Sequence, residues 1–169
     1  ALVGCSKSDK ADAAPKDYTK ILHDARPDED NEYYMIFSPG EDGKFTAQYG
    51  YSDSYDAAQL DEEIRNMLLP LLNLEEDMYT DFAASVSGMM VQSYGIAIVK
   101  PAEGKQQAVS EALDAYVQSQ MQSMEHYLED QYQIAASSHI STAPTGEVIL
   151  VCCENPETVM NAIKTALAA

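Results

Sequence analysis

A long amphipathic stripe between Gly104 and Leu128 constrains the fold more than any other part of this sequence. Its apolar residues recur at spacings of three and four, which places them on one side of a helix. Such a helix is stable only when its apolar side is buried against another element. The sequence therefore predicts a helix that packs on a sheet. The apolar positions are Val109, Ala112, Leu113, Tyr116, Val117, Met121, Met124 and Leu128.

Strands are predicted on both sides of this helix. Residues 77–86 alternate in part between apolar and polar side chains, and residues 94–99 form a continuous apolar run with β-branched side chains. Residues 132–138 and 148–153 are predicted as two further strands, joined by a longer connection over residues 139–146. A helix is expected over residues 53–67, with Pro70 kinking or ending it. A last helix is expected from Asn155-Pro156-Glu157 onward.

This order of elements predicts a single globular α+β domain over residues 17–169. Its core is strand-strand-helix-strand-strand-helix. Consecutive strands with short links pair antiparallel, so the sheet is expected to be antiparallel. We expect the helices to pack mainly on one face of the sheet and leave the other face more open.

The N-terminal third is expected to hold a short helix, an acidic loop and a hairpin. The helix begins at Asp17 or Tyr18 and is stopped by Pro27. Residues 28–31 are read as the acidic loop. Residues 32–52 are predicted as a hairpin in which two aromatic-rich runs flank a turn with Pro, Gly and Asp.

The first residues contain Leu2-Val3-Gly4-Cys5, which has the order of a bacterial lipobox. In that pattern a small residue precedes the cleaved bond and the cysteine thiol receives the lipid. We expect residues 1–4 to be the remainder of a signal peptide and residues 5–16 to be a polar, lipidated tether that begins at Cys5. A chance match at a cytosolic start is the alternative.

A longer segment resembles a known family. It runs Tyr94-Gly95-Ile96-Ala97-Ile98-Val99-Lys100-Pro101-Ala102-Glu103-Gly104-Lys105, and Val109, Glu111-Ala112-Leu113, Tyr116-Val117, Asp130-Gln131-Tyr132 and residues 146–153 continue the likeness. This pattern resembles the DUF4358 family of Firmicutes lipoproteins over roughly residues 75–168. The hairpin over residues 32–52 looks like an embellishment. The resemblance implies no activity, cofactor or catalytic residue. It implies a lipid-anchored, extracytoplasmic location on a Gram-positive cell.

Charge limits the partners. The chain has 28 acidic and 10 basic residues, for a formal net charge of −18. Such a surface repels nucleic acid and anionic lipid headgroups, so nucleic acid is not expected as a partner. The apolar runs are too short for a membrane span. Membrane attachment is therefore expected only through lipid on Cys5.

The sequence predicts no catalytic residue, metal site or cofactor. The histidines, His23, His126 and His139, show no metal-ligand spacing, and the carboxylates do not follow a calcium-loop order. Cys152 and Cys153 are neighbours in an apolar run and are expected to be core residues that point to opposite faces of a strand. A thiol pair of one of them with His139 is the disfavoured alternative, because such a site needs an exposed thiol.

Tyrosine is in excess, with 11 residues and no tryptophan. Exposed tyrosines beside acids suit a peptide or glycan surface, while cross-strand packing that holds the hairpin is the alternative. We expect Tyr33 and Tyr49 to share one face across the hairpin. The predicted function is a non-catalytic binding or interaction module of the cell envelope. The competing classes are an envelope hydrolase or thiol enzyme and an accessory solute-binding lipoprotein. The candidate binding surface is Tyr33, Tyr34, Tyr49, Tyr51 and Tyr55.

Overall fold

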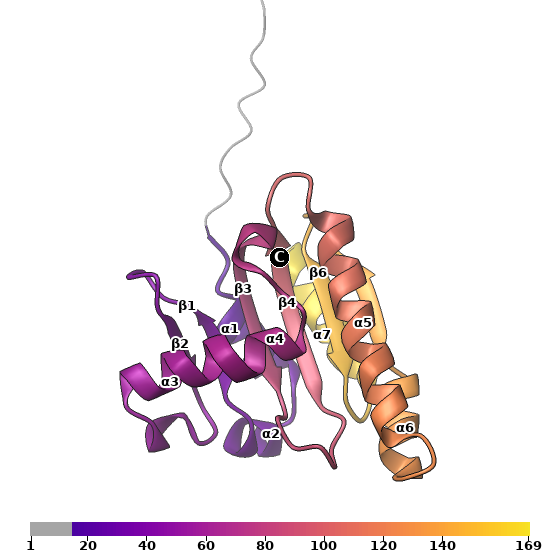
Figure 1. Cartoon of the computed structure of the whole chain (residues 1–169). Coiled ribbons are helices and arrows are strands. Elements are labelled where there is room, and N and C mark those ends of the chain that lie inside the picture. The colour runs from indigo at the N-terminus through magenta and orange to yellow at the C-terminus, as the bar shows by residue number, and fades with distance from the viewer. Residues whose placement is uncertain (1–14) are drawn as a thin grey trace, which may run out of the picture.

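The computed structural model describes residues 15–169, and Figure 1 shows the arrangement of its elements. Cys5 and the rest of the expected lipobox lie outside the described residues. The helices are α1 (Tyr18–Ala25), α2 (Asp28–Tyr33), α3 (Ala57–Glu63), α4 (Leu69–Leu71), α5 (Gln106–Met124), α6 (Glu129–Ala136) and α7 (Pro156–Ala168), with the 3₁₀ helices η1 (Ser52–Ser54) and η3 (Glu76–Met78) and the π-helix η2 (Ile64–Leu68). The strands are β1 (Ile36–Pro39), β2 (Phe45–Gln48), β3 (Tyr79–Val86), β4 (Gly95–Pro101), β5 (His139–Thr142) and β6 (Val148–Cys152).

The strands form one six-stranded antiparallel sheet in the order β2-β1-β3-β4-β6-β5. The two central strands pair along most of their length, with Val86 opposite Gly95 and Phe82 opposite Val99, and the register shifts between Tyr79 and Asp81. β6 pairs with the other side of β4 and places Cys152 opposite Gly95. The predicted α+β class and antiparallel sheet are confirmed. The core order of two strands, a helix, two strands and a helix is also present, with one short helix added before β5.

Helices cover both faces of the sheet, so the expected open face is wrong (Figure 1). Alternate residues of each strand point to opposite faces, and both sets here are apolar. Phe82 and Leu150 face the side that α3, α4 and α5 cover. Ile98 and Ile149 face the side that α1 and α7 cover. Since β3, β4 and β6 are apolar on both sides, one layer of helices could not have buried them.

The segment from α3 to α4 is one continuous helical rod that passes through Pro70. Asp56 caps its start and forms a capping box with Gln59. The turn before the proline widens into a π-helix, in which the Leu69 amide donates to the carbonyl of Ile64. A proline cannot donate a backbone hydrogen bond, and its ring clashes with the carbonyl four residues back. The wider turn removes both problems, so Pro70 neither ends the rod nor leaves it regular.

Three local predictions need correction. Residues 28–31 are not a loop, because three acids in the first turn of α2 favour a helix after Pro27. Residues 132–138 are not a strand. They belong mostly to α6, whose first turn holds Glu129 and Asp130. The strand lies just beyond, at β5, inside the stretch expected to be a connection. The final helix begins at Pro156 as predicted, although the Asn155 side chain makes no capping hydrogen bond.

The first described residues and the end of α7 lie at one pole of the domain. The Lys16 ammonium donates to the Leu167 carbonyl at 2.8 Å and to the Thr145 hydroxyl at 3.2 Å. It also lies 3.6 Å from the carboxylate of the buried Glu147, directly before β6. The opposite end of β6, at Cys153, is the other pole. Within residues 15–169, no helix has the length and apolar character needed to span a membrane.

Candidate functional site

A buried guanidinium lies under the second pole. Arg26 follows the last residue of α1, and only 4% of its surface is exposed. It donates to the Ser85 hydroxyl at 2.9 Å, to the Tyr94 hydroxyl at 3.1 Å and to the Asn31 side-chain oxygen at 2.6 Å. Its fourth acceptor is the backbone carbonyl of Tyr34. The Arg26 network therefore joins α1 and α2 to β3 and β4.

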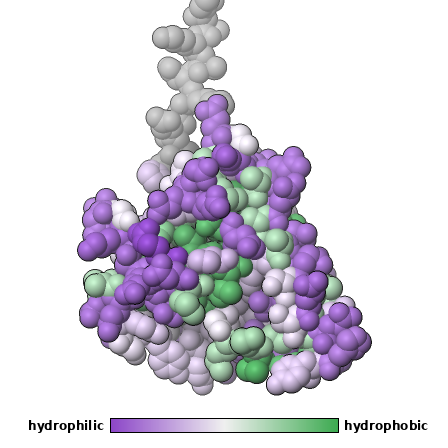
Figure 2. Space-filling model, viewed as in Figure 1, coloured by the Kyte–Doolittle hydropathy of each residue, from purple (hydrophilic) through white to green (hydrophobic). Residues whose placement is uncertain are grey.

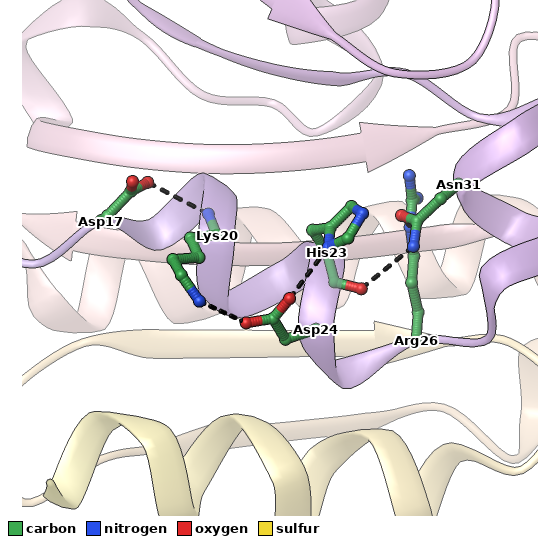
Figure 3. A network of polar contacts seen from close by, with 6 residues as sticks. All are labelled: Asp17, Lys20, His23, Asp24, Arg26 and Asn31. Carbon is green, nitrogen blue, oxygen red and sulfur yellow. Dashed lines mark hydrogen bonds and ion pairs between the residues drawn. The ribbon is translucent and has the colours of Figure 1, made fainter.

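Figure 3 shows how α1 leads into this network. The Asp17 side chain accepts from the Lys20 amide, and Lys20 pairs with Asp24 one turn later. The Asn31 amide group donates to the backbone carbonyl of His23 at 3.1 Å, while its oxygen accepts from Arg26. Asn31 thus fixes the end of α1 to α2 and orients the guanidinium toward the sheet.

The acceptors around Arg26 are all neutral. Among the residues that the structure describes, no carboxylate lies within ion-pair distance of its guanidinium. A buried charge without a close counter-ion is costly unless its hydrogen bonds are complete, and here each donor group has a partner. The network therefore gives the surrounding side chains one fixed arrangement.

Two tyrosines form the wall above this network. The rings of Tyr34 and Tyr94 are stacked, with centroids 3.9 Å apart and planes within 10°. Burial raises the pKa of the Tyr94 hydroxyl well above its usual range, so that hydroxyl stays protonated. The Tyr116 hydroxyl of α5 donates to the Tyr94 carbonyl at 3.1 Å. The position of Tyr94 is thus set from the guanidinium side and from the α5 side.

A hollow of about 710 Å³ opens beyond this wall, and we call it the tyrosine pocket. Segments far apart in the sequence meet around it: α2, the turn at Tyr51, the β3–β4 loop, α6 and the residues after β6. A hollow of this volume fits a small ligand or the end of a larger one. It is lined by Pro27, Glu29, Asp30, Tyr33, Tyr34, Tyr51, Met89, Val91, Gln92, Ser93, Tyr94, Gln131, Ile134, Cys153, Glu154 and Asn155.

The β3–β4 loop gives the pocket an exposed apolar rim. Met89 is 63% exposed, and Met90 and Val91 beside it are also exposed. In Figure 2 hydrophobic residues gather at the lower edge of the molecule, where this loop projects in Figure 1. Large apolar side chains that project together into solvent are typical of a contact surface.

One polar atom of the pocket lacks a partner. Ser93 is 3% exposed, and its hydroxyl oxygen has no hydrogen-bond partner among the described residues. Its backbone amide is held by the Gln131 side chain at 2.8 Å, so the residue is fixed in place. Buried hydroxyls in folded proteins are nearly always hydrogen-bonded. Ser93 therefore brings a hydroxyl with unused hydrogen-bonding capacity into the lining of the pocket.

The titratable groups of the lining are acidic or phenolic, apart from one thiol. Glu29, Asp30 and Glu154 carry the carboxylates. Asp30 is half-buried, and this desolvation raises the pKa of its carboxyl, although the Arg26 charge and the Tyr94 hydroxyl act in the opposite direction. None of the lining residues is a lysine, arginine or histidine. The pocket therefore has a negative character.

The structure brings three of the five predicted tyrosines together. Tyr33, Tyr34 and Tyr51 line the tyrosine pocket. Tyr49 lies elsewhere, with its ring 4.4 Å from that of His23. Tyr55 borders a second, smaller hollow beside α3 and η2. The expected cross-strand pair of Tyr33 and Tyr49 is wrong, because Tyr33 ends α2 and Tyr49 follows β2.

Sequence reasoning missed Arg26, Ser85 and Ser93. The sequence held no signal for the first two, because their meeting depends on a contact between residues 59 positions apart. Ser93 directly precedes Tyr94-Gly95, where α5 packs closely on the sheet, since a Cβ on Gly95 would meet the Tyr116 ring.

The two described cysteines are core residues, as predicted. Cys152 lies in the cluster under α5 and Cys153 in the cluster under α7, so they point to opposite faces. Burial raises the pKa of the Cys153 thiol to about 12. A nucleophilic thiol needs a lowered pKa. Within residues 15–169, no group of three or more His, Cys, Asp or Glu side chains is placed to hold a metal ion.

Comparison with known families gives a match. The model of a domain of unknown function, DUF4358, matches residues 52–154. The chain belongs to the DUF4358 family. The matched region of this DUF4358 protein begins at η1, includes β3, β4, α5 and β6, and ends at Glu154 on the pocket rim. It therefore leaves out the β1–β2 hairpin and α7. No curated protein and no solved structure matches the chain.

Proposed function

We propose that this DUF4358 protein is a non-catalytic binding module and that the tyrosine pocket is its ligand site. The observation that carries the proposal is the unpartnered hydroxyl of Ser93, a residue whose backbone amide is held by Gln131, in the lining of a hollow walled by tyrosines. The lining combines tyrosine rings and other apolar side chains with polar groups and carboxylates, and polar groups that converge on a hollow with apolar walls are typical of a binding site. The Arg26 network supports this role, because it holds Tyr34 and Tyr94 in one position before any ligand arrives.

The ligand is proposed to be part of a larger envelope molecule, either a peptide or a glycan. Tyr33 and Tyr51 are 51% and 60% exposed, so their rings extend the pocket outward. Met89 and Val91 continue this surface on the loop side. Tyrosine rings bury much area while their hydroxyls stay hydrogen-bonded, which suits both peptides and sugars.

We place this module outside the cytoplasm, held by lipid on Cys5. The order Leu2-Val3-Gly4-Cys5 and the polar residues after it support this location. A lipidated N-terminal cysteine carries more than one acyl chain, which is sufficient for stable anchoring. Mass spectrometry of the protein from its native bacterium tests this part. A peptide that begins at diacylated Cys5 is expected, and an unmodified Cys5 with residues 1–4 still attached would refute the anchor.

Catalysis receives less support from the pocket. The lining holds two side chains of a nucleophile type, Ser93 and Cys153, and the Cys153 thiol is buried with a raised pKa. None of the lining residues is a histidine that could act as a general base toward either of them. For an accessory solute-binding lipoprotein, the expected site lies between two lobes, whereas this pocket lies at the ends of the central strands of one sheet.

Retention on isolated Gram-positive peptidoglycan sacculi tests the binding role. The full chain with Cys5→Ser removes lipid as a cause of retention. In that background, Tyr33→Ala with Tyr51→Ala removes two exposed rings of the pocket, and Tyr127→Ala removes a 71% exposed tyrosine outside it. The parent chain and the Tyr127 variant are expected to sediment with the sacculi, and the double variant is expected to stay in solution. Equal behaviour of all three chains would overturn the proposal.

A further inference from the structure

The charge of the tyrosine pocket restricts its ligand. Three carboxylates, on Glu29, Asp30 and Glu154, line one hollow. The guanidinium of Arg26 lies behind the Tyr34–Tyr94 wall and offsets one of them at most. The negative charge that remains stands on a chain whose net charge is −18. An anionic group would be repelled from this hollow, and a cationic group would be attracted.

The aromatic lining has the same preference. The face of a tyrosine ring carries negative potential and attracts an ammonium or guanidinium group. Tyr33 and Tyr51 each have at least half of their surface free for such contact. The rings also give apolar contact to the carbon atoms that bear the charged group of an organic cation. A bare metal ion would gain little here, since no metal-holding group of side chains occurs among residues 15–169.

Ser93 adds an observation that is independent of the charge. Its hydroxyl oxygen is buried in the lining and unpartnered among the described residues, while its backbone amide is fixed by Gln131. A hydroxyl has two lone pairs that accept hydrogen bonds. An ammonium group offers three donors and no acceptor. Such a group can therefore donate to the Ser93 oxygen and still donate to carboxylates of the pocket.

We propose that the tyrosine pocket recognises an organic cation, namely an ammonium group on an apolar stem. This inference rests on the proposed binding function and deepens it. The ammonium approaches Ser93 and the carboxylates, and the stem packs against the tyrosine rings. Two sources share this chemistry: a free amine, and the lysine side chain or amino terminus of a peptide.

Matched small probes test the preference. The protein is the ¹⁵N-labelled full chain with Cys5→Ser, and the readout is the chemical shift of backbone amides around Ser93. Phenethylamine and 2-phenylethanol form a free pair that differs mainly in charge. N-acetyl-lysine methylamide and its ε-acetylated form are the peptide-like pair. We expect each amine to shift the pocket amides and each neutral partner to bind at least roughly tenfold more weakly. The amine that binds more tightly identifies the source: phenethylamine indicates a free amine, and N-acetyl-lysine methylamide indicates a peptide.

Variants of the lining give the second arm. Ser93→Ala and the pair Glu29→Gln with Glu154→Gln should each weaken amine binding by roughly tenfold, because each removes a contact to the cation. Glu103→Gln removes an exposed carboxylate outside the pocket and should leave binding unchanged. Shifts confined to the pocket that lack any charge preference would overturn the cation inference and leave the binding function standing. Amide shifts from no probe would also overturn it, whereas failure of the binding function itself would appear as the loss of sacculus retention.

Discussion

Tyr116 of α5 closes directly over Gly95, the first residue of β4. A Cβ on residue 95 would lie 2.5 Å from the Tyr116 hydroxyl oxygen and 2.9 Å from two of its ring carbons. The same hydroxyl donates to the carbonyl of Tyr94. The long helix is therefore seated on the sheet at the point where the pocket wall begins, and a side chain at residue 95 would lift it.

Gly95→Ala is expected to destabilise the domain by about 1–3 kcal/mol, the usual cost of overpacking a well-packed core. Gly88→Ala is the matched control. Its added Cβ would have one neighbour, at 3.8 Å, so its cost should stay within about 0.5 kcal/mol. Urea unfolding measures both. Tyr116→Leu should reduce the penalty of the alanine in a double-mutant cycle. Equal urea unfolding midpoints for the two glycine variants would contradict the close contact between residue 95 and Tyr116.

Arg26→Met is expected to cost about 3–5 kcal/mol, because it leaves Ser85, Asn31 and Tyr94 with unmet hydrogen bonds in a buried place. Arg65→Met is the comparison. Arg65 pairs with Asp61 and Glu76 on the surface, where such pairs contribute about 1 kcal/mol or less. Thermal and urea unfolding of the two variants give the difference. A loss for Arg26→Met as small as that for Arg65→Met would mean that the network is not a structural element.

The thiols of Cys152 and Cys153 are expected to resist modification in the folded protein. Both are buried, and burial raises the pKa of each, with that of Cys153 near 12. The Cys5→Ser chain should release almost no colour with Ellman's reagent at pH 8, and two thiols per chain should react in concentrated urea. Rapid reaction of one thiol in the native protein would contradict this expectation and support the alternative that the protein is a thiol enzyme.

Asp30 predicts a change in stability with pH. Its pKa in the folded state is raised by burial, so the folded state binds more protons than the unfolded state between the two pKa values. The contribution of this residue to stability therefore grows as the pH falls through the folded pKa, and it is unfavourable at neutral pH. Asp30→Asn, which cannot ionise, should raise the melting temperature at pH 7, and this gain should shrink in acid.

The control for this experiment is Asp114→Asn on the exposed side of α5. Its melting temperature is expected to follow that of the parent chain at both pH values. If Asp30→Asn lowers the melting temperature at pH 7, the attraction between Asp30 and Arg26 outweighs the cost of burying the carboxylate. The electrostatic description of the pocket would then need revision.

The spacing of apolar residues was sufficient to predict the elements that bury one continuous apolar face. The stripe of α5, the partial alternation of β3 and the apolar runs of β4 and β6 predicted the centre of the sheet and its antiparallel pairing. It failed for α6, because Tyr132 and Ile134 alternate as in a strand, while the acids of the first turn and the alanines after them favour a helix. It also failed for the second layer of helices, since a run that is apolar at every position does not say how many layers cover it.

The tyrosine pocket could not be predicted from local patterns in the sequence. Tyr33, Tyr34 and Tyr51 could be selected by their excess and their nearby acids, but Tyr49 satisfied the same criterion and lies elsewhere. Tyr33 and Tyr34 differ from Tyr49 because they lie where α2 ends and the chain turns into β1. This turn lies inside a run of aromatic residues that resembles a strand. Arg26 and Ser93 are defined by burial and by contacts with residues far away in the sequence, Ser85 for Arg26 and Gln131 for Ser93. Such properties depend on the tertiary fold and leave no spacing in the sequence.

Lys16 and the end of α7 meet before the first residue of β6, and the pocket opens after its last. The strand between them spans roughly 17 Å. The first described residues and the end of α7 thus both lie on the side of the domain away from the tyrosine pocket. A bilayer, a resin or a fused partner joined at either extremity would leave that hollow turned toward the surrounding solution, where a large polymer can reach it without passing the attachment.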